Sequence, residues 1–331
     1  MEIPLPDEQH TPEAPRLGAF SRATLAGSAL LMSVLCIAAS ISFVTAPDRS
    51  SRPQQAAAAH VLLANPSPFQ NVTLQAKAAY VQDLTTGKVL YEHNADVQLP
   101  LASITKVALV LVISEVLQPD ENVIISRDAV MRGEGGGLGT GDTWLVGDLI
   151  DFTLLASSNA GAEALADAAD AKLLLKYPDA PESHATVWRM NALAKDLGLT
   201  KTYFLNGSGL DASKTQPGSV SSARDVGVLF LHVSNTAREL FKSTAERGLQ
   251  LGPQNGKPKT TVNTNEALPD IPGLIMGKTG YTDLAGGNLA ILFDVSPGHP
   301  VVAVVLGSTH DGRFEDMKKL VDAGRASVNA D

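Results

Sequence analysis

The sequence predicts an α/β protein of the α+β type, with an antiparallel sheet flanked by helices. Two observations lead to this prediction. Alternating, β-rich segments occur near both ends of the region after residue 70, whereas segments with helical periodicity fill its middle. A sheet built from both ends of that region and covered by helices accounts for this order. A third observation, an uncharged apolar run at residues 23–46, predicts an N-terminal transmembrane helix before the folded body.

Local patterns define the individual elements. Residues 78–83 and 88–92 alternate around Thr85-Thr86-Gly87, as in a strand–turn–strand unit. Ser222, followed three residues later by Asp225, forms a capping-box pattern that opens a helix. The glycine-rich segment 133–141 predicts a flexible loop. The other expected elements are helices at 103–116, 146–156, 160–169, 186–197, 223–233 and 313–323, a hairpin at 248–264, and strands at 288–295 and 301–307.

Four segments of different composition predict the domain organisation. Residues 1–22 are polar and contain prolines, which predicts a disordered tail on the cytoplasmic side. The 24 uncharged positions of residues 23–46 favour a membrane anchor over a cleaved signal, although Val44-Thr45-Ala46 offers small residues before a cleavage point. Residues 47–70 are rich in Pro, Ala, Gln and Ser and form a linker. Residues 71–331 form the predicted catalytic domain.

Composition excludes several classes of function. The net charge is -9 and no basic stripe occurs, so we expect no nucleic-acid partner. The single cysteine, Cys36, allows no internal disulfide and lies in the apolar run, which argues against a catalytic thiol. The seven histidines form no metal-binding cluster, and the glycine-rich loop lacks a phosphate-binding lysine. We therefore expect neither a metal nor a phosphate-binding site.

A candidate nucleophile lies at the start of a helical run. Ser103-Ile104-Thr105-Lys106 places a hydroxyl and an amine three residues apart, hence on one helix face. Apolar residues follow Lys106, and burial among them would favour its neutral form. A neutral amine beside a serine forms a nucleophile–base pair, and the helix N-terminus supplies N–H donors for an oxyanion.

Two further motifs follow in the chain. Ser157-Ser158-Asn159 lies between two helical runs, where Ser157 could pass on a proton and Asn159 could bind a substrate carbonyl. Lys278-Thr279-Gly280 precedes a β-rich run and offers a cation and a hydroxyl for a carboxylate. Its glycine would allow a ligand to approach the backbone.

The order of the three motifs resembles the active-site motifs of penicillin-binding proteins and serine β-lactamases. Neighbouring residues narrow the resemblance to the D-alanyl-D-alanine carboxypeptidases, the low-molecular-mass penicillin-binding proteins of peptidase family S11. These neighbours are Leu99-Pro100-Leu101-Ala102, Met190-Asn191, Leu197-Gly198, Asn206-Gly207-Ser208-Gly209-Leu210-Asp211 and Gly277 with Tyr281-Thr282. The resemblance covers residues 78–323. It implies a β-lactamase/transpeptidase-like fold, in which an all-helical subdomain stands beside the sheet.

The resemblance also implies a role for each motif residue. Ser103 would attack the D-Ala-D-Ala carbonyl, Lys106 would take its proton, and Ser157 would relay a proton to the leaving D-alanine. Asn159 would position the substrate, and Lys278, Thr279 and Gly280 would form the carboxylate side of the site. The backbone N–H groups of Ser103 and Tyr281 would form the oxyanion hole, with no metal or organic cofactor.

The implied partners are peptidoglycan stem peptides ending in D-Ala-D-Ala, β-lactam antibiotics as covalent inhibitors, and a bacterial cell membrane. A single N-terminal helix would cross that membrane, with the catalytic domain outside the cytoplasm. One departure from the family pattern is Ala160-Gly161, where Asp-Ala usually follows the motif asparagine.

Three alternative functions remain at this stage. A D,D-endopeptidase that cuts peptidoglycan crosslinks would carry the same motifs. A serine β-lactamase is disfavoured because no glutamate between the second and third motifs is followed by asparagine four residues on. A non-catalytic penicillin-sensing or wall-binding module is disfavoured because the polar side chains of all three motifs are present.

Overall fold

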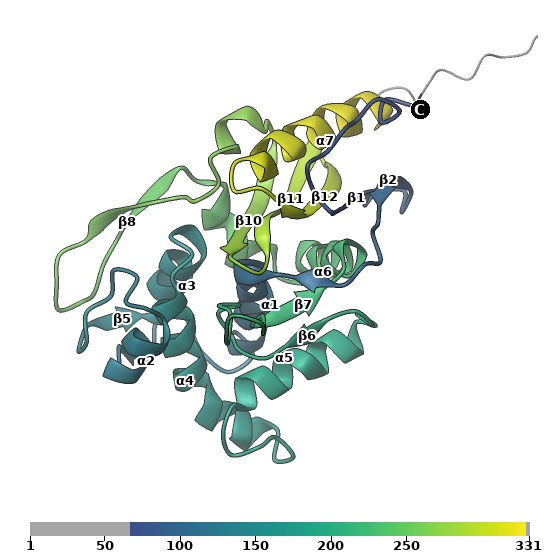
Figure 1. Cartoon of the computed structure of the whole chain (residues 1–331). Coiled ribbons are helices and arrows are strands. Elements are labelled where there is room, and N and C mark those ends of the chain that lie inside the picture. Colours follow the sequence, from purple (N-terminus) through teal and green to yellow (C-terminus); the bar gives the residue numbers. More distant parts are fainter. Residues whose placement is uncertain (1–66, 329–331) are drawn as a thin grey trace, which may run out of the picture. The chain divides into compact units, whose positions relative to one another are not determined.

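A five-stranded sheet joins the two ends of the folded region. The computed structural model describes residues 67–328. Within them the strands pair in the order β10-β11-β12-β1-β2, and every neighbouring pair is antiparallel, which confirms the predicted sheet (Figure 1). Its strands are β1 (Ala78–Asp83), β2 (Val89–His93), β10 (Leu274–Thr282), β11 (Gly286–Ser296) and β12 (His299–Ser308).

Helices cover both faces of this sheet, so its central strands are apolar on both sides. α6 (Ala223–Thr236) and α7 (Gly312–Val328) both pack against β11, β12 and β1. Successive side chains of a strand point to opposite faces, and those of β12 accordingly enter two different cores. One core contains Val302, Val304 and Leu306, and the other contains Val301, Ala303 and Val305.

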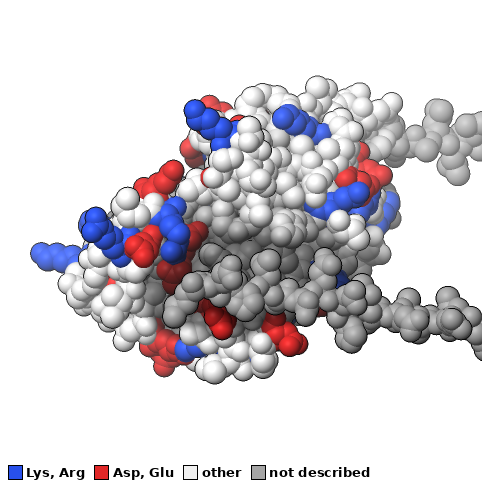
Figure 2. All heavy atoms as spheres, turned by 60° about the horizontal axis from the view of Figure 1, so that its bottom comes forward, with Lys and Arg blue, Asp and Glu red and all other residues white. Residues whose placement is uncertain are grey.

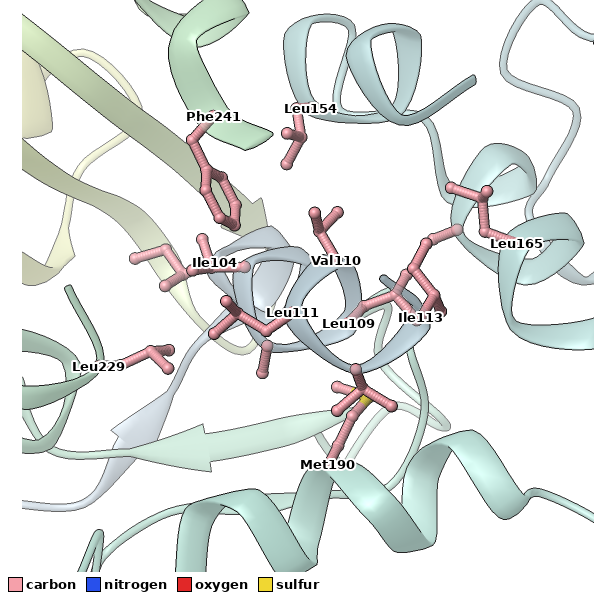
Figure 3. Close-up of a cluster of buried hydrophobic side chains, with 14 of the residues drawn as sticks. Ile104, Leu109, Val110, Leu111, Ile113, Leu154, Leu165, Met190, Leu229 and Phe241 are labelled. Carbon is pink, nitrogen blue, oxygen red and sulfur yellow. The ribbon is translucent and has the colours of Figure 1, made fainter. Parts of the chain in front are cut away.

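The helix α1 (Thr105–Ile113) is buried on every side. Apart from Thr105 and Lys106 its residues are apolar, and a helix that is apolar all round belongs inside a protein. Figure 3 shows Leu109, Val110 and Ile113 pointing into a cluster that also contains Leu154 and Met190 from neighbouring helices. The position of α1 matters because the first candidate motif lies at its N-terminal end.

The all-helical part surrounds α1 with α3 (Val146–Leu155), α4 (Asn159–Lys176) and α5 (Ala185–Asp196). α2 (Arg127–Arg132) packs on α4. The smaller elements are β3 (Leu99–Pro100), β4 (Asn122–Ile124), β5 (Thr143–Leu145), β6 (Tyr203–Phe204), β7 (Ser219–Ser221), β8 (Gly248–Leu251), β9 (Lys259–Val262), and the 3₁₀ turns η1 (Ala102–Ile104), η2 (Arg238–Ala245) and η3 (Leu268–Asp270).

Some local predictions differ from the structure in detail. Ser103 lies in the 3₁₀ turn η1 rather than in the α-helix itself, which begins at Thr105 and ends at Ile113. Ser222 caps α6 by accepting from the Asp225 backbone N–H at 3.1 Å, as predicted. The Asp225 carboxylate does not complete the capping box, because it accepts instead from the Lys201 N–H and the Thr202 hydroxyl.

Part of the predicted organisation lies outside the described residues. The tail at 1–22, the membrane segment at 23–46 and the linker up to residue 66 fall in this part. Between residues 67 and 328, no helix combines the length and the apolar character needed to cross a membrane. Phe69, near the start of the described region, is buried and stacks on Tyr91 with ring centroids 5.1 Å apart.

Charged residues of both signs mix over the molecular face in Figure 2. Arg132 pairs with Glu163 at 3.0 Å and with Asp167 at 2.7 Å, which joins α2 to α4. Arg224 pairs with Glu92 at 2.8 Å and Asp96 at 2.7 Å. Exposed pairs of this kind contribute little stability, so the fold depends mainly on its two apolar cores.

We expect Leu109→Ala to lower the free energy of unfolding by about 2–5 kcal/mol, because Leu109 is fully buried in α1 and its truncation leaves a cavity. Leu175→Ala is the matched control, since Leu175 is 85% exposed, and should change it by less than about 0.5 kcal/mol. Urea denaturation followed by circular dichroism measures both. Equal losses would contradict the central position of α1.

Candidate active site

A tightly held turn fixes the position of Ser103. Ala102, the residue before it, has a φ of +50°, a left-handed conformation that costs energy for any residue except glycine. The Thr105 hydroxyl donates to the Ala102 carbonyl at 2.7 Å. Gly209 packs against the same carbonyl so closely that a Cβ there would lie 2.0 Å from the oxygen. These contacts fix η1 and leave Ser103 about nine-tenths buried, with 9% exposure.

The Lys106 amine lies at the centre of the site. Its Nζ is fully buried and lies 2.7 Å from Ser103 Oγ, 2.8 Å from Asn159 Oδ1 and 2.7 Å from the Ser208 carbonyl oxygen. An ammonium has three N–H groups, so these contacts use all of them. The amine is therefore held in one orientation, toward the serine hydroxyl.

Burial also makes Lys106 a usable base. Removal from water disfavours the charged amine and lowers the pKa of Lys106 to about 7, an effect that the negative charge of Glu163 partly offsets. At neutral pH a substantial fraction of the amine therefore carries a free lone pair. A base is most effective when its pKa is near the working pH.

The second motif lies where α3 ends and α4 begins. Ser157 has a φ of +56°, and this left-handed residue turns the chain sharply between the two helices. Ser158 then caps α4 by accepting from the Gly161 N–H at 3.1 Å. Asn159 is the first residue of α4, and its side chain turns to Lys106. Ser157 thus turns the chain, Ser158 caps α4 and Asn159 lines the site.

The third motif lies on β10, which forms one edge of the five-stranded sheet. The buried Lys278 Nζ donates to Ser157 Oγ at 2.9 Å and so joins the sheet to the helical part. Burial first, and then the positive charges of Lys106 and Arg313, hold the pKa of Lys278 well below its ordinary value. A bound carboxylate would supply the missing countercharge. The site is thus electrostatically prepared for an anion.

The residues after Lys278 form the edge of the site beside η1. The Thr279 and Thr264 hydroxyls are hydrogen-bonded at 2.6 Å. A Cβ on Gly280 would lie 2.7 Å from the Leu101 carbonyl oxygen and 3.3 Å from the Ser103 nitrogen. The strand–turn contact thus requires glycine here, a reason different from the ligand approach predicted from sequence. Tyr281, 49% exposed, is the next residue along this edge.

Sequence reasoning missed Arg313, which was read only as the start of a helix. Its guanidinium is buried and Nη1 donates to the Gly280 carbonyl at 2.9 Å. The Arg313 Nε is buried with no hydrogen-bond partner among the described residues. Its charge faces Lys278 and lies 5.9 Å from the Tyr281 ring centroid. No local motif marks this arginine, because it reaches the site only through the packing of α7 on the sheet.

The eight residues predicted for the site therefore meet at one place, although they come from separate parts of the chain. A hydroxyl, a buried amine near its titration point and a second cation beside another hydroxyl are the groups needed for acyl transfer. Across residues 67–328, no cluster of three or more His, Cys, Asp or Glu side chains is placed to hold a metal ion.

Comparisons with known proteins agree with this arrangement. The family model described as D-alanyl-D-alanine carboxypeptidase matches residues 64–310. Penicillin-binding protein D2 from Listeria monocytogenes, solved in its ampicillin-bound form, is 30% identical, with a TM-score of 0.64, and the match covers 77% of this chain and 98% of that one. The fold is thus the α+β fold of penicillin-binding proteins. The chain belongs to the D-alanyl-D-alanine carboxypeptidase family.

Two curated relatives differ in the activity that their names give. D-alanyl-D-alanine carboxypeptidase DacC from Escherichia coli is 30% identical over 76% of this chain and 62% of its own length. This chain thus spans less than two thirds of that relative. A D-alanyl-D-alanine endopeptidase from Pseudomonas aeruginosa is 29% identical over 80% of this chain and 84% of its own length. Family membership therefore leaves open which bond is cut.

We expect Glu163→Gln to lower the pKa of Lys106 below about 7, because it removes the charge that partly offsets burial. In the native protein the amine should be mainly protonated below about pH 7 and mainly neutral above it. Asp167→Asn is the matched control, since Asp167 pairs with the same Arg132 but is not among the charges that act on Lys106. NMR titration of labelled lysine side chains measures both. Equal titration midpoints in all three proteins would contradict the prediction.

Proposed function

We propose that this protein is a serine-type D-Ala-D-Ala carboxypeptidase that trims peptidoglycan stem peptides through an acyl-enzyme on Ser103. The observation that carries the proposal is the buried Lys106 amine, 2.7 Å from the Ser103 hydroxyl and with a pKa of about 7. An amine of that pKa can remove the serine proton at neutral pH. Membership of the carboxypeptidase family supports the choice of substrate.

In the acylation step, neutral Lys106 accepts the Ser103 proton while Ser103 Oγ attacks the carbonyl between the two D-alanines. Asn159 binds the substrate backbone on the acyl side of that bond. The backbone N–H groups of Ser103 and Tyr281 stabilise the oxyanion, since the close contact between Gly280 and the Ser103 nitrogen brings their two segments together.

The leaving group is handled by the second and third motifs. Lys278 and Thr279 hold the terminal carboxylate, and its negative charge restores the proton affinity that burial takes from Lys278. Ser157, hydrogen-bonded to Lys278, relays the proton that Lys106 took from Ser103 to the departing D-alanine amine as the C–N bond breaks. Water then hydrolyses the Ser103 ester and releases the shortened peptide.

β-Lactam antibiotics are the expected covalent inhibitors of the same serine. Their strained amide takes the place of the scissile peptide bond, and their carboxylate takes the place of the terminal carboxylate. The ampicillin-bound relative supports this. Turnover of the antibiotic is not proposed, because the chain lacks the glutamate–asparagine pattern that supplies a deacylation base in serine β-lactamases.

We expect Ser103→Ala to abolish both the covalent adduct with a fluorescent penicillin and the release of D-alanine from a pentapeptide ending in D-Ala-D-Ala. The substitution removes the nucleophile and leaves the fold unchanged. Ser114→Ala, at the other end of α1, is the matched control and should retain both activities. Mass spectrometry locates the adduct. An adduct that persists in Ser103→Ala, or one located elsewhere in the native protein, would refute the proposed function.

We also propose that residues 23–46 form a single transmembrane helix that holds the catalytic domain outside the cytoplasm of a bacterial cell. The absence of charge over 24 positions and the extracytoplasmic location of peptidoglycan support this. We expect the full chain to stay in the membrane pellet after alkaline carbonate extraction, and a chain lacking residues 1–46 to be soluble. Release of the full chain by carbonate would show that the segment does not span the membrane.

A further inference from the structure

The short segment between β12 and α7 packs beside the strand that carries the third motif. Thr309 begins the helix, because its hydroxyl accepts from the Gly312 N–H at 2.9 Å and its carbonyl accepts from the Arg313 N–H at 3.2 Å. A Cβ on Gly287 would lie only 2.0 Å from the same carbonyl oxygen. Gly287 pairs with Tyr281 across β11 and β10, so the segment is held close to Tyr281.

The next two side chains, His310 and Asp311, are not needed to cap the helix and instead form a chain of contacts with Arg313. Arg313 Nη2 lies 3.3 Å from His310 Nε2, and His310 Nδ1 lies 2.6 Å from Asp311 Oδ1. A guanidinium only donates, and an ionised carboxylate only accepts. The neutral ring with its proton on Nδ1 is the tautomer that satisfies both contacts. The carboxylate then makes Nε2 a stronger acceptor for the arginine.

The His310 ring also contacts Tyr281. The two ring centroids are 4.9 Å apart and the planes make an angle of 79°, which is an edge-to-face arrangement. The His310 side chain is 51% exposed, so this contact lies at the rim of the site rather than in the core. Tyr281 directly follows Gly280, and its backbone N–H is one of the two proposed oxyanion donors. His310 thus contacts both the arginine and the strand on the carboxylate side.

Arg313 depends on few contacts for its orientation. Among the described residues its guanidinium has two hydrogen-bond acceptors, the Gly280 carbonyl at 2.9 Å and His310 Nε2, while Nε is buried without one. After burial and Lys106, the positive charge of Arg313 is a further cause of the lowered pKa of Lys278. That charge therefore acts where the terminal carboxylate is proposed to bind. Removal of the His310 ring would leave the guanidinium with a single acceptor.

We propose that His310 is a positioning residue for the carboxylate side of the site. By accepting from Arg313, it keeps the guanidinium charge beside Lys278, where the terminal carboxylate of the substrate binds. The inference rests on the proposed function and adds no group that touches the reacting atoms. Because the carboxylate is held both before and during attack on the peptide bond, loss of the His310 acceptor should weaken substrate binding and leave the chemical step nearly unchanged.

The test uses three substitutions at this position in the full chain. His310→Phe keeps a ring against Tyr281 but lacks the acceptor, and we expect it to raise KM for a D-Ala-D-Ala pentapeptide about five- to tenfold with kcat within about twofold. His310→Ala, which removes the ring as well, should raise KM at least as much. His310→Gln supplies a side-chain oxygen as acceptor and should restore KM to within about twofold of the native value.

Two controls separate this role from a general effect on the fold. His93→Phe alters an exposed histidine on β2, at the opposite edge of the sheet, and should change neither KM nor kcat. All variants should form the full Ser103 adduct at a saturating concentration of fluorescent penicillin, which shows that they are folded.

A matched pair of thioester substrates tests the dependence on the carboxylate. Both carry the same acyl-D-alanyl group, and only one has a carboxylate on the leaving thiol. The native enzyme should cleave both, because a thiol leaves readily. The loss in His310→Phe should appear only with the substrate that has the carboxylate.

The remaining outcomes are decisive in either direction. An unchanged KM in His310→Phe, a His310→Gln variant no better than His310→Phe, or equal losses on the two thioesters would each overturn the positioning role and leave the proposed function standing. A native protein without an adduct at Ser103 would overturn the proposed function, and this inference with it.

Discussion

The contact on which the rest of the site depends is the burial of the Lys106 amine among three oxygen atoms. Placing an ammonium in the interior is costly unless its hydrogen bonds are satisfied. The three acceptors come from η1, α4 and the loop at Ser208, so satisfying the amine draws three separate segments together. The residual cost appears as the lowered pKa of Lys106, which is the property that the chemistry needs. The burial of this amine thus both draws the three segments together and lowers the pKa of Lys106.

Burial also lowers the pKa of Lys278, the lysine that joins the sheet to the helical part through Ser157. Two buried lysines and Arg313 act on one another in the same site, and this repulsion adds to burial in lowering the pKa of Lys278. Such a site is stabilised by any bound carboxylate, whether of a peptide or of a β-lactam. Two residues at the site have left-handed backbone conformations. Ala102 directly precedes the motif serine Ser103, and Ser157 is itself a motif serine. Strain of this kind persists only where the surrounding contacts enforce it, as the Gly209 contact does at Ala102.

The sequence was most informative where a signal is local. Helix periodicity, strand alternation and the three motifs depend on residues a few positions apart, so the central elements and the eight candidate residues could be named in advance. Strands of two or three residues, such as β3 and β7, are too short to show a period. Arg313, Thr264 and the Ser208 carbonyl were missed as site groups because each reaches the site through long-range packing. The 3₁₀ turn at Ser103 depends on Gly209, more than a hundred residues away.

The same packing gives a physical reason for the chain's departure from the family pattern at Ala160-Gly161. A Cβ on Gly161 would lie 2.2 Å from Thr153 Oγ1, so α3 and α4 touch too closely there for a side chain. A Cβ on Gly133 would lie 2.1 Å from the Ala160 nitrogen, so the glycine-rich loop begins directly against the start of α4. An aspartate at position 160 would be buried under that loop. The small pair therefore lets the loop lie close to Ser158, whose Oγ would be 3.2 Å from a Cβ on Gly136.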